Sequence, residues 1–109
     1  MTDVIQVQTT TPERQDAEHI ASLLVGKRLA ACVQVSGPIT STYRWKGAVE
    51  SSQEWLCTIK TRQDLFEQVE KTIREIHPYQ EPEILAVAVV AGSKGYLSWL
   101  NKELETPTE

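Results

Sequence analysis

The side chains best suited to chemistry lie in the segment His77–Glu83, which holds an imidazole, a phenol and two carboxylates. Its two prolines, Pro78 and Pro82, fix their own φ angles and bias the residue before each toward extended backbone. His77 should therefore end the helix that precedes it, and Glu81 should be extended where a strand begins. Such a stiff connector can hold a site, and it can equally be a rigid joint between two elements.

Metal binding would need soft ligands, and the chain offers four: Cys32, Cys57, His19 and His77. Copper prefers thiolate and imidazole, and a competent site needs several of them at one point. We assign His77 and Cys32 to a candidate site for copper or another divalent cation. The alternative for His77 is a capping or packing role, and for Cys32 it is packing as a small hydrophobic side chain. Cys57 lies in an alternating pattern that predicts core packing.

A second candidate set could bind a small anionic ligand, and its members are Tyr43, Lys60, Tyr79, Glu83 and Trp99. A lysine and a glutamate beside aromatic donors could orient such a ligand or perform acid–base chemistry. The alternative is a Lys–Glu pair and hydrogen-bonded aromatics that join neighbouring subunits. The chain contains no Gly-rich phosphate loop, HExxH or GxSxG pattern. We therefore assign no catalytic residues and expect a protein that is not an enzyme.

Two segments have helical periodicity. The first is predicted to begin with Thr11 as N-cap and Pro12 at the first helical position, and its apolar face extends to Val25. The second is predicted to follow a capping box formed by Thr61 and Asp64 and to end at the proline-bounded connector.

Strand patterns occupy residues 4–9, 29–35, 39–45, 54–60 and 83–90, and a short helix is predicted over residues 96–104. Gly37-Pro38 marks a bulge or bend between the second and third patterns, which together make one interrupted strand. The order is β-α-β-β-α-β plus a terminal helix, which is the α+β, ferredoxin-like plan with both helices on one face of an antiparallel sheet. Residues 1–109 form one domain, and residues 105–109 should be a frayed tail.

The two central strands should form an unusually long ribbon that turns at Lys46–Ala48. An arm of about 14 residues at roughly 3.3 Å each spans about 45 Å. A domain of this size has a diameter of only about 34 Å. The ribbon should overhang the domain and expose strand edges and apolar surface. We infer a homo-oligomer built through the ribbon, with Trp45 and Trp55 as interface anchors.

Composition excludes several classes of partner. The net charge is −4 and basic residues are not clustered, which argues against nucleic acid. No apolar run approaches the roughly 18 residues that cross a bilayer, and the segment Met1–Val4 does not resemble a secretory signal. The two cysteines form no CxxC pair, so we expect reduced thiols in a cytoplasmic protein.

Three sequence blocks are distinctive when taken together: Leu29-Ala30-Ala31-Cys32-Val33, Thr42-Tyr43-Arg44-Trp45-Lys46-Gly47, and residues 77–85 followed by Tyr96-Leu97-Ser98-Trp99-Leu100. In this order they resemble the CutA family of divalent-cation tolerance proteins. The resemblance covers about residues 4–104. It implies a ferredoxin-like fold and a tight homotrimer interlocked through the long ribbons, similar in architecture to the PII-type signalling trimers. It implies an association with divalent cations, copper in particular, and no accepted enzymatic reaction.

The chain departs from some copper-associated relatives at two places. Those relatives have a cysteine at the end of the first strand and a histidine directly before the one that matches His77. Here these positions hold Thr9 or Thr10, and Ile76. We therefore expect a homotrimeric cytoplasmic protein of the copper-tolerance type with weak metal binding at most. The alternative is a PII-like signalling trimer that binds an unidentified small molecule in a cleft between subunits.

Overall fold

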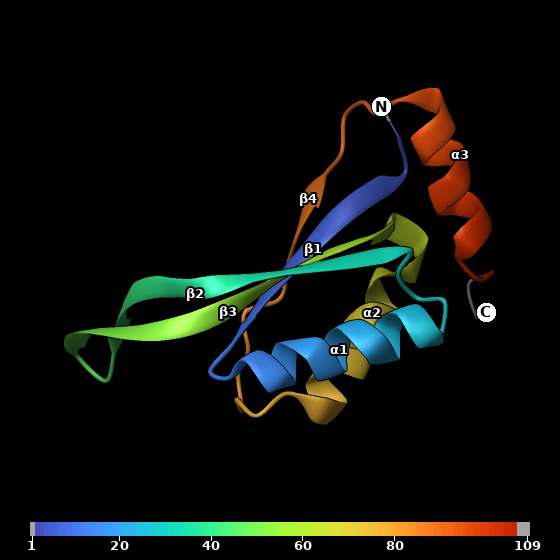
Figure 1. The fold of residues 1–109 in the computed structure, drawn as a ribbon. Helices are drawn as coiled ribbons and strands as arrows, with labels where there is room; N and C mark the ends of the chain where they lie inside the picture. The colour runs from blue at the N-terminus through green and yellow to red at the C-terminus, as the bar shows by residue number, and fades with distance from the viewer. Residues whose placement is uncertain (1, 107–109) are drawn as a thin grey trace.

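The structure is a computed structural model that describes residues 2–106, and its chain follows the predicted order β-α-β-β-α-β with a closing helix (Figure 1). The elements are β1 (Val4–Thr11), α1 (Arg14–Gly26), β2 (Cys32–Trp45), β3 (Ala48–Arg62), the 3-10 helix η1 (Gln63–Leu65), α2 (Phe66–Ile76), β4 (Leu85–Ala88) and α3 (Lys94–Glu103). The sheet is antiparallel with strand order β2-β3-β1-β4. This topology confirms the predicted α+β, ferredoxin-like fold.

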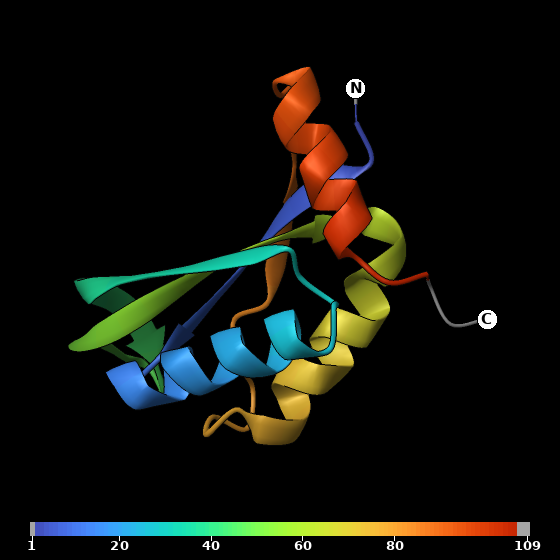
Figure 2. The same cartoon turned by 45° about the vertical axis from the view of Figure 1, so that its right-hand side comes forward.

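Helices α1 and α2 cover one face of the sheet (Figures 1 and 2). Side chains alternate between the faces of a strand, so every second residue of β1 and β3 points at these helices. Val7 and Ile59 are directly opposite each other in the register and are fully buried, as are Leu24 of α1 and Ile73 of α2. Each such side chain contributes about 1.5–3 kcal/mol of burial free energy. The two helices thus form the core with one face of the sheet and leave the other face open.

The open face carries the intervening residues of all four strands. The registers place Cys32, Lys60, Gln6 and Val87 in one row across β2, β3, β1 and β4, and Gln34, Thr58, Gln8 and Leu85 in the next. Directly opposite residues share a face and have their side chains within reach of one another. Helix α3 lies beside the end of the sheet where β1 begins and β3 ends (Figure 2).

The β2–β3 ribbon extends beyond the helices, as predicted (Figure 1). It pairs from Cys32↔Lys60 to Trp45↔Ala48, with a bulge at Gly37-Pro38. The molecule measures 44 × 26 × 23 Å, and its longest dimension matches the expected length of an arm. The turn at residues 46 and 47 has positive φ at both positions, which suits a tight hairpin and confirms the predicted turn.

Both predicted helix caps are wrong. Thr11 is the last residue of β1, and α1 begins at Arg14 with Glu13 at its N-cap. Thr61 lies inside β3, and its buried hydroxyl donates a hydrogen bond to the Leu29 carbonyl at 2.7 Å. The local patterns resembled caps, but the pairing of β1 with β3 continues through both threonines. Both residues are therefore part of the sheet and cannot begin a helix. Long-range strand pairing therefore overrides the local signal at both places.

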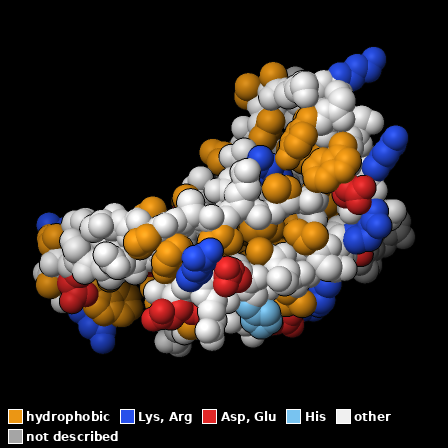
Figure 3. Space-filling view, viewed as in Figure 1, with side chains coloured by type: hydrophobic (Ala, Val, Ile, Leu, Met, Phe, Trp, Pro, Cys, Tyr) orange, Lys and Arg blue, Asp and Glu red, His pale blue; other side chains and the backbone are white. Residues whose placement is uncertain are grey.

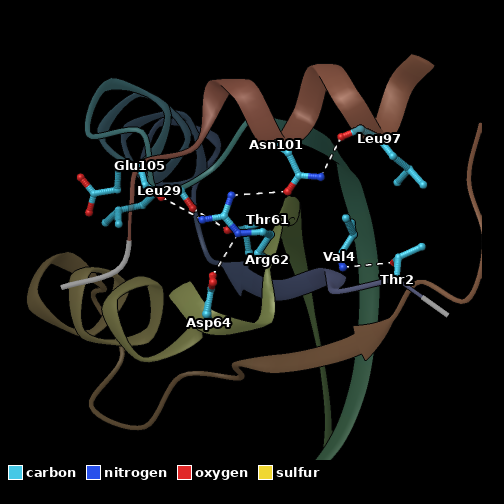
Figure 4. A network of polar contacts seen from close by, with 9 residues as sticks. All are labelled: Thr2, Val4, Leu29, Thr61, Arg62, Asp64, Leu97, Asn101 and Glu105. Atoms are coloured by element: carbon cyan, nitrogen blue, oxygen red, sulfur yellow. Dashed lines mark hydrogen bonds and ion pairs between the residues drawn. The ribbon is translucent and has the colours of Figure 1, made fainter. Parts of the chain in front are cut away.

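The last strand and the tail also differ from prediction. β4 covers only Leu85–Ala88, and α3 begins at Lys94, two residues earlier than expected. Glu105 was predicted to be frayed, but its N–H donates to the Arg28 carbonyl at 2.9 Å. Its carbonyl accepts from Arg62 Nη2, also at 2.9 Å (Figure 4). Residues 107–109 of the predicted tail lie outside the described residues.

Candidate functional site

His77 connects the end of α2 to the end of β1. The helix ends at Ile76, and His77 has extended backbone, as its position before Pro78 predicts. The Tyr79 N–H donates to Nδ1 of the His77 ring at 3.0 Å, so this nitrogen carries no proton. Nε2 lies 2.8 Å from the Thr10 carbonyl oxygen and must donate to it. Both ring nitrogens of a neutral imidazole are therefore engaged.

The surroundings of His77 favour this neutral state. The side chain is buried, and burial lowers its pKa below the ordinary value. The hydrogen bond to Thr10 and the negative charges of Asp16 and Glu54 oppose that shift without reversing it. A metal ion could bind to the ring only by displacing one of the two hydrogen bonds.

Tyr79 follows on the same connector and bonds to a buried acid. Its hydroxyl donates to Glu54 Oε2 at 2.8 Å, and only 7% of Glu54 is exposed. Burial, the hydrogen bond and the charge of Glu54 all raise the pKa of Tyr79. Tyr43 is close enough to add to this shift, and its own hydroxyl is 3.1 Å from Ser52 Oγ. We call the cluster of Thr10, Glu54, His77 and Tyr79 the His77 joint.

Lys60 lies in a different setting, on the open face of the sheet. Its Nζ is 5.5 Å from the centroid of the Tyr96 ring, and that ring is 5.5 Å from the ring of Trp99. Both aromatic residues come from α3, and hydrophobic side chains gather over this helix and the adjoining end of the sheet (Figure 3). Cys32 stands directly opposite Lys60 on β2. We call the surface formed by Gln6, Gln8, Thr58, Lys60, Tyr96 and Trp99 the Lys60 face.

The five predicted ligand-binding residues do not converge within one chain. Tyr79 belongs to the His77 joint and Tyr43 lies near it on the ribbon, whereas Lys60 and Trp99 belong to the Lys60 face. Lys60 and the glutamate that binds Tyr79 are six positions apart on β3, roughly 20 Å along the strand. Glu83 is exposed, and its side chain forms no hydrogen bond or ion pair within residues 2–106.

The two predicted metal ligands are also separate in one chain. The strand register places Cys32 in the same row as Gln6 of β1. His77 bonds to Thr10, which is four positions further along β1. The two rows are therefore about 13 Å apart along the strand. Cys32 is half-buried on the open face and is not packed in the core. In the part of the chain that the structure describes, no group of three or more His, Cys, Asp or Glu residues could hold an ion.

Cys57 behaves as predicted. It is fully buried against α1, with its thiol 3.7 Å from the Ala17 carbonyl oxygen. Burial raises the pKa of this thiol to about 11, so it stays protonated and unreactive.

Sequence reasoning missed Glu54 and Tyr96. Glu54 lies in a run of polar residues on the ribbon, and nothing in that run distinguishes it. Its hydrogen-bond partner, Tyr79, is distant in the sequence and is brought next to it only by the fold. Tyr96 did give a signal, because it precedes Trp99 by three residues on a predicted helix and must share its face.

None of the helices formed by residues 2–106 combines the length and apolar character needed to cross a membrane. The chain is a ferredoxin-like protein with a long projecting ribbon and a rigid joint where α2 leads to β4. Residues 5–103 match the family described as CutA1 divalent ion tolerance protein, and the chain belongs to this family.

Named relatives agree with this assignment. The divalent-cation tolerance protein CutA of Thermus thermophilus is 41% identical over 96 residues, which are 88% of this chain and 93% of the relative. The protein CutA of Mus musculus is 40% identical over 97 residues, 89% of this chain, and the chain spans only 55% of that longer protein.

Solved structures agree as well. CutA from Xylella fastidiosa has a TM-score of 0.92 and 39% identity, over 95% of this chain and all of that one. The structure from Archaeoglobus fulgidus, named a periplasmic divalent cation tolerance protein CutA, has a TM-score of 0.90 and 34% identity over 94% of this chain and 99% of that one.

Proposed function

We propose that this chain acts in divalent-cation tolerance as a cytoplasmic homotrimer that binds copper or another divalent cation weakly and catalyses no reaction. Membership of the CutA1 family supports the link to divalent cations. The observation that carries the weak binding is the state of His77, whose two ring nitrogens already have hydrogen-bond partners. A cation must compete with these bonds for the imidazole.

The projecting ribbon supports the trimer. Trp45 is 57% exposed and Val49 64% exposed near its tip, and single domains rarely leave such side chains open on a long strand pair. Association of three ribbons would cover them. Sedimentation at micromolar concentration tests this part: we expect three times the chain mass, and a monomer would contradict it.

An assembly would also change what the metal ligands can do. Cys32 and His77 lie too far apart in one chain to share an ion. A site with both ligands must therefore combine Cys32 of one chain with His77 of another. Such a site would depend on assembly and would bind copper more tightly than either side chain alone.

Titration with copper and zinc tests the metal proposal. We expect wild-type binding that is micromolar or weaker, and further weakening in both His77→Ala and Cys32→Ala. His19→Ala is the matched control, because His19 is an exposed histidine on α1 and should leave binding unchanged. Tight binding that is indifferent to His77→Ala and Cys32→Ala would overturn the assignment of these ligands.

The two free thiols are compatible with the proposed cytoplasmic location. Cys32 is on the open face of the sheet and Cys57 on the helix-covered face, so within one chain they cannot form a disulfide. Fractionation of cells that produce the native chain tests the location, and recovery outside the cytoplasm would contradict it.

The non-enzymatic role is supported by the His77 joint, whose acid, phenol and imidazole bond to protein groups.

A further inference from the structure

A groove lies on the helix layer, where the loop after α1 meets α2 and the segment after α3. Helices α1 and α2 cover the side of the sheet opposite the open face (Figures 1 and 2). The groove has a volume of about 580 Å³, which is within the range of roughly 300–1,000 Å³ that small-molecule sites occupy. We call it the helix groove, and its lining includes Lys27, Leu29, Lys71, Thr72, Glu75 and Glu105.

The helix groove is separate from the surfaces through which the chain would assemble. The trimer proposed above forms through the β2–β3 ribbon, and the open face of the sheet lies on the same side of the core as the aromatic side chains of α3. No lining residue of the groove belongs to the ribbon or to any other strand. Association through the ribbon and the open face would therefore leave the groove uncovered.

The charged side chains of the groove balance one another without pairing. Its lining has two ammonium groups, from Lys27 and Lys71, and two carboxylates, from Glu75 and Glu105. The side chains of Lys27, Lys71 and Glu75 are exposed and form no hydrogen bond or ion pair within residues 2–106. The carboxylates would repel a simple anion and the ammonium groups a simple cation. The lining therefore suits a ligand that carries both charges.

Helix α2 sets the spacing of two of these charges. Lys71 and Glu75 are four residues apart, so they lie on one stripe of the helix about 6 Å apart along its axis. Thr72 lies on the same stripe and is buried, and its hydroxyl donates to the Gln68 carbonyl at 2.8 Å. Leu29, which is 4% exposed, adds an apolar side chain to the lining. A small zwitterion can thus reach both charges while an apolar group rests against Leu29.

Glu105 is held in place before any ligand binds. Its N–H donates to the Arg28 carbonyl at 2.9 Å. Its carbonyl accepts from Arg62 Nη2, also at 2.9 Å (Figure 4). Its Oε1 accepts from Gln68 Nε2 at 3.2 Å, whereas Oε2 forms no hydrogen bond within residues 2–106. A carboxylate that is fixed beforehand reduces the ordering cost of binding.

We propose that the helix groove binds a free α-amino acid with an apolar side chain, in its zwitterionic form. Lys27 and Lys71 bind its carboxylate, Glu75 and Glu105 bind its ammonium group, and Leu29 contacts its side chain. This site does not depend on the proposed metal response or on the number of chains in the assembly.

The proposal is tested by titrating the wild-type protein, in its solution assembly, with leucine and three probes that each lack one group. N-acetyl-leucine lacks the ammonium group, leucinamide lacks the carboxylate, and glycine lacks the side chain. We expect leucine to give saturable shifts in the amide NMR signals of α2 and of residues 27–29 and 105. Each probe should bind at least about threefold more weakly than leucine. No saturable binding of leucine, or equal binding of N-acetyl-leucine or leucinamide, would overturn the proposal.

Variants assign each charge of the ligand to its partner. Lys71→Met should weaken leucine binding at least about threefold and reduce the preference for leucine over leucinamide. Glu75→Gln should weaken it similarly and reduce the preference for leucine over N-acetyl-leucine. Glu67→Gln is the matched control, because Glu67 is an exposed glutamate of α2 that does not line the groove. Unchanged leucine binding in Lys71→Met and Glu75→Gln, or an equal loss in Glu67→Gln with wild-type circular dichroism, would place the ligand elsewhere.

Discussion

The His77 joint and the Lys60 face use comparable side chains in opposite ways. At the joint, the imidazole, the phenol and the buried carboxylate each bond to another protein group. On the Lys60 face, the ammonium forms no ion pair within residues 2–106 and lies over an aromatic ring, and the neighbouring side chains of Gln6 and Gln8 form no hydrogen bond within these residues. The joint resembled a site in the sequence because it concentrates reactive groups. In the structure, those groups are occupied with holding α2, β1 and β3 together.

This difference predicts different responses to mutation. A buried hydrogen bond stabilises the fold modestly, but removing one partner leaves the other group buried and unsatisfied. An unpaired cation on an open face contributes little to the folding of its own chain. Changes at the joint should therefore lower stability more than changes at the Lys60 face.

His77→Ala should have the largest effect on stability. It leaves the Thr10 carbonyl and the Tyr79 N–H without their partner and opens a cavity where the ring was. We expect the free energy of unfolding to fall by about 2–4 kcal/mol, measured by urea denaturation at a fixed protein concentration. The exposed His19→Ala should change it by less than about 0.5 kcal/mol. Equal stability of the two variants would show that the joint is not structural.

Tyr79→Phe should have the next largest effect. It removes the donor to Glu54 and leaves a buried carboxylate oxygen unpaired, at a cost of about 1–2 kcal/mol. A double-mutant cycle with Glu54→Ala, which removes the acceptor, should give a coupling energy of about 1 kcal/mol between the two side chains. Tyr96→Phe is the control from the Lys60 face, since the Tyr96 hydroxyl forms no hydrogen bond within residues 2–106. A coupling near zero would mean that the Tyr79–Glu54 contact contributes no stability.

The state of His77 predicts a smaller effect of pH. Burial lowers its pKa in the folded protein, so the unfolded chain takes up the proton first as the pH falls. The stabilisation is complete above the unfolded pKa of about 6.5 and is lost as the pH falls through the folded value. We expect the Tm to fall between pH 7 and pH 5 more steeply for the wild type than for His77→Gln. Parallel Tm profiles of the two proteins would contradict this assignment.

The sequence was sufficient for the elements that repeat a simple pattern. Periodicity located α2 and its end at His77, and the length of the ribbon predicted its projection. The local sequence gave the wrong prediction at Thr11 and Thr61, where pairing between distant strands determines the structure. The pairing of β1 with β3 cannot be predicted from the sequence of either strand alone.

The candidate site shows the same limit. The residue types were recognised, but the predicted ligand set mixed Tyr79 of the joint with Lys60 of the open face. Only the strand register shows that these residues belong to different sites. It pairs Lys60 with Gln6 on β1, whereas the joint contacts β1 at Thr10. The buried partner Glu54 could not be predicted, since only the folded chain brings it to Tyr79.

Lys60→Met should have the smallest effect on stability and decides whether the comparison holds. The variant loses a cation–π contact worth about 0.5–1 kcal/mol, and it also removes the desolvation of a half-buried charge. Because these two terms oppose each other, we expect the free energy of unfolding to change by less than about 0.5 kcal/mol in urea denaturation. A loss as large as that of His77→Ala would mean that Lys60 is a structural residue, and the contrast between the two regions would then fail.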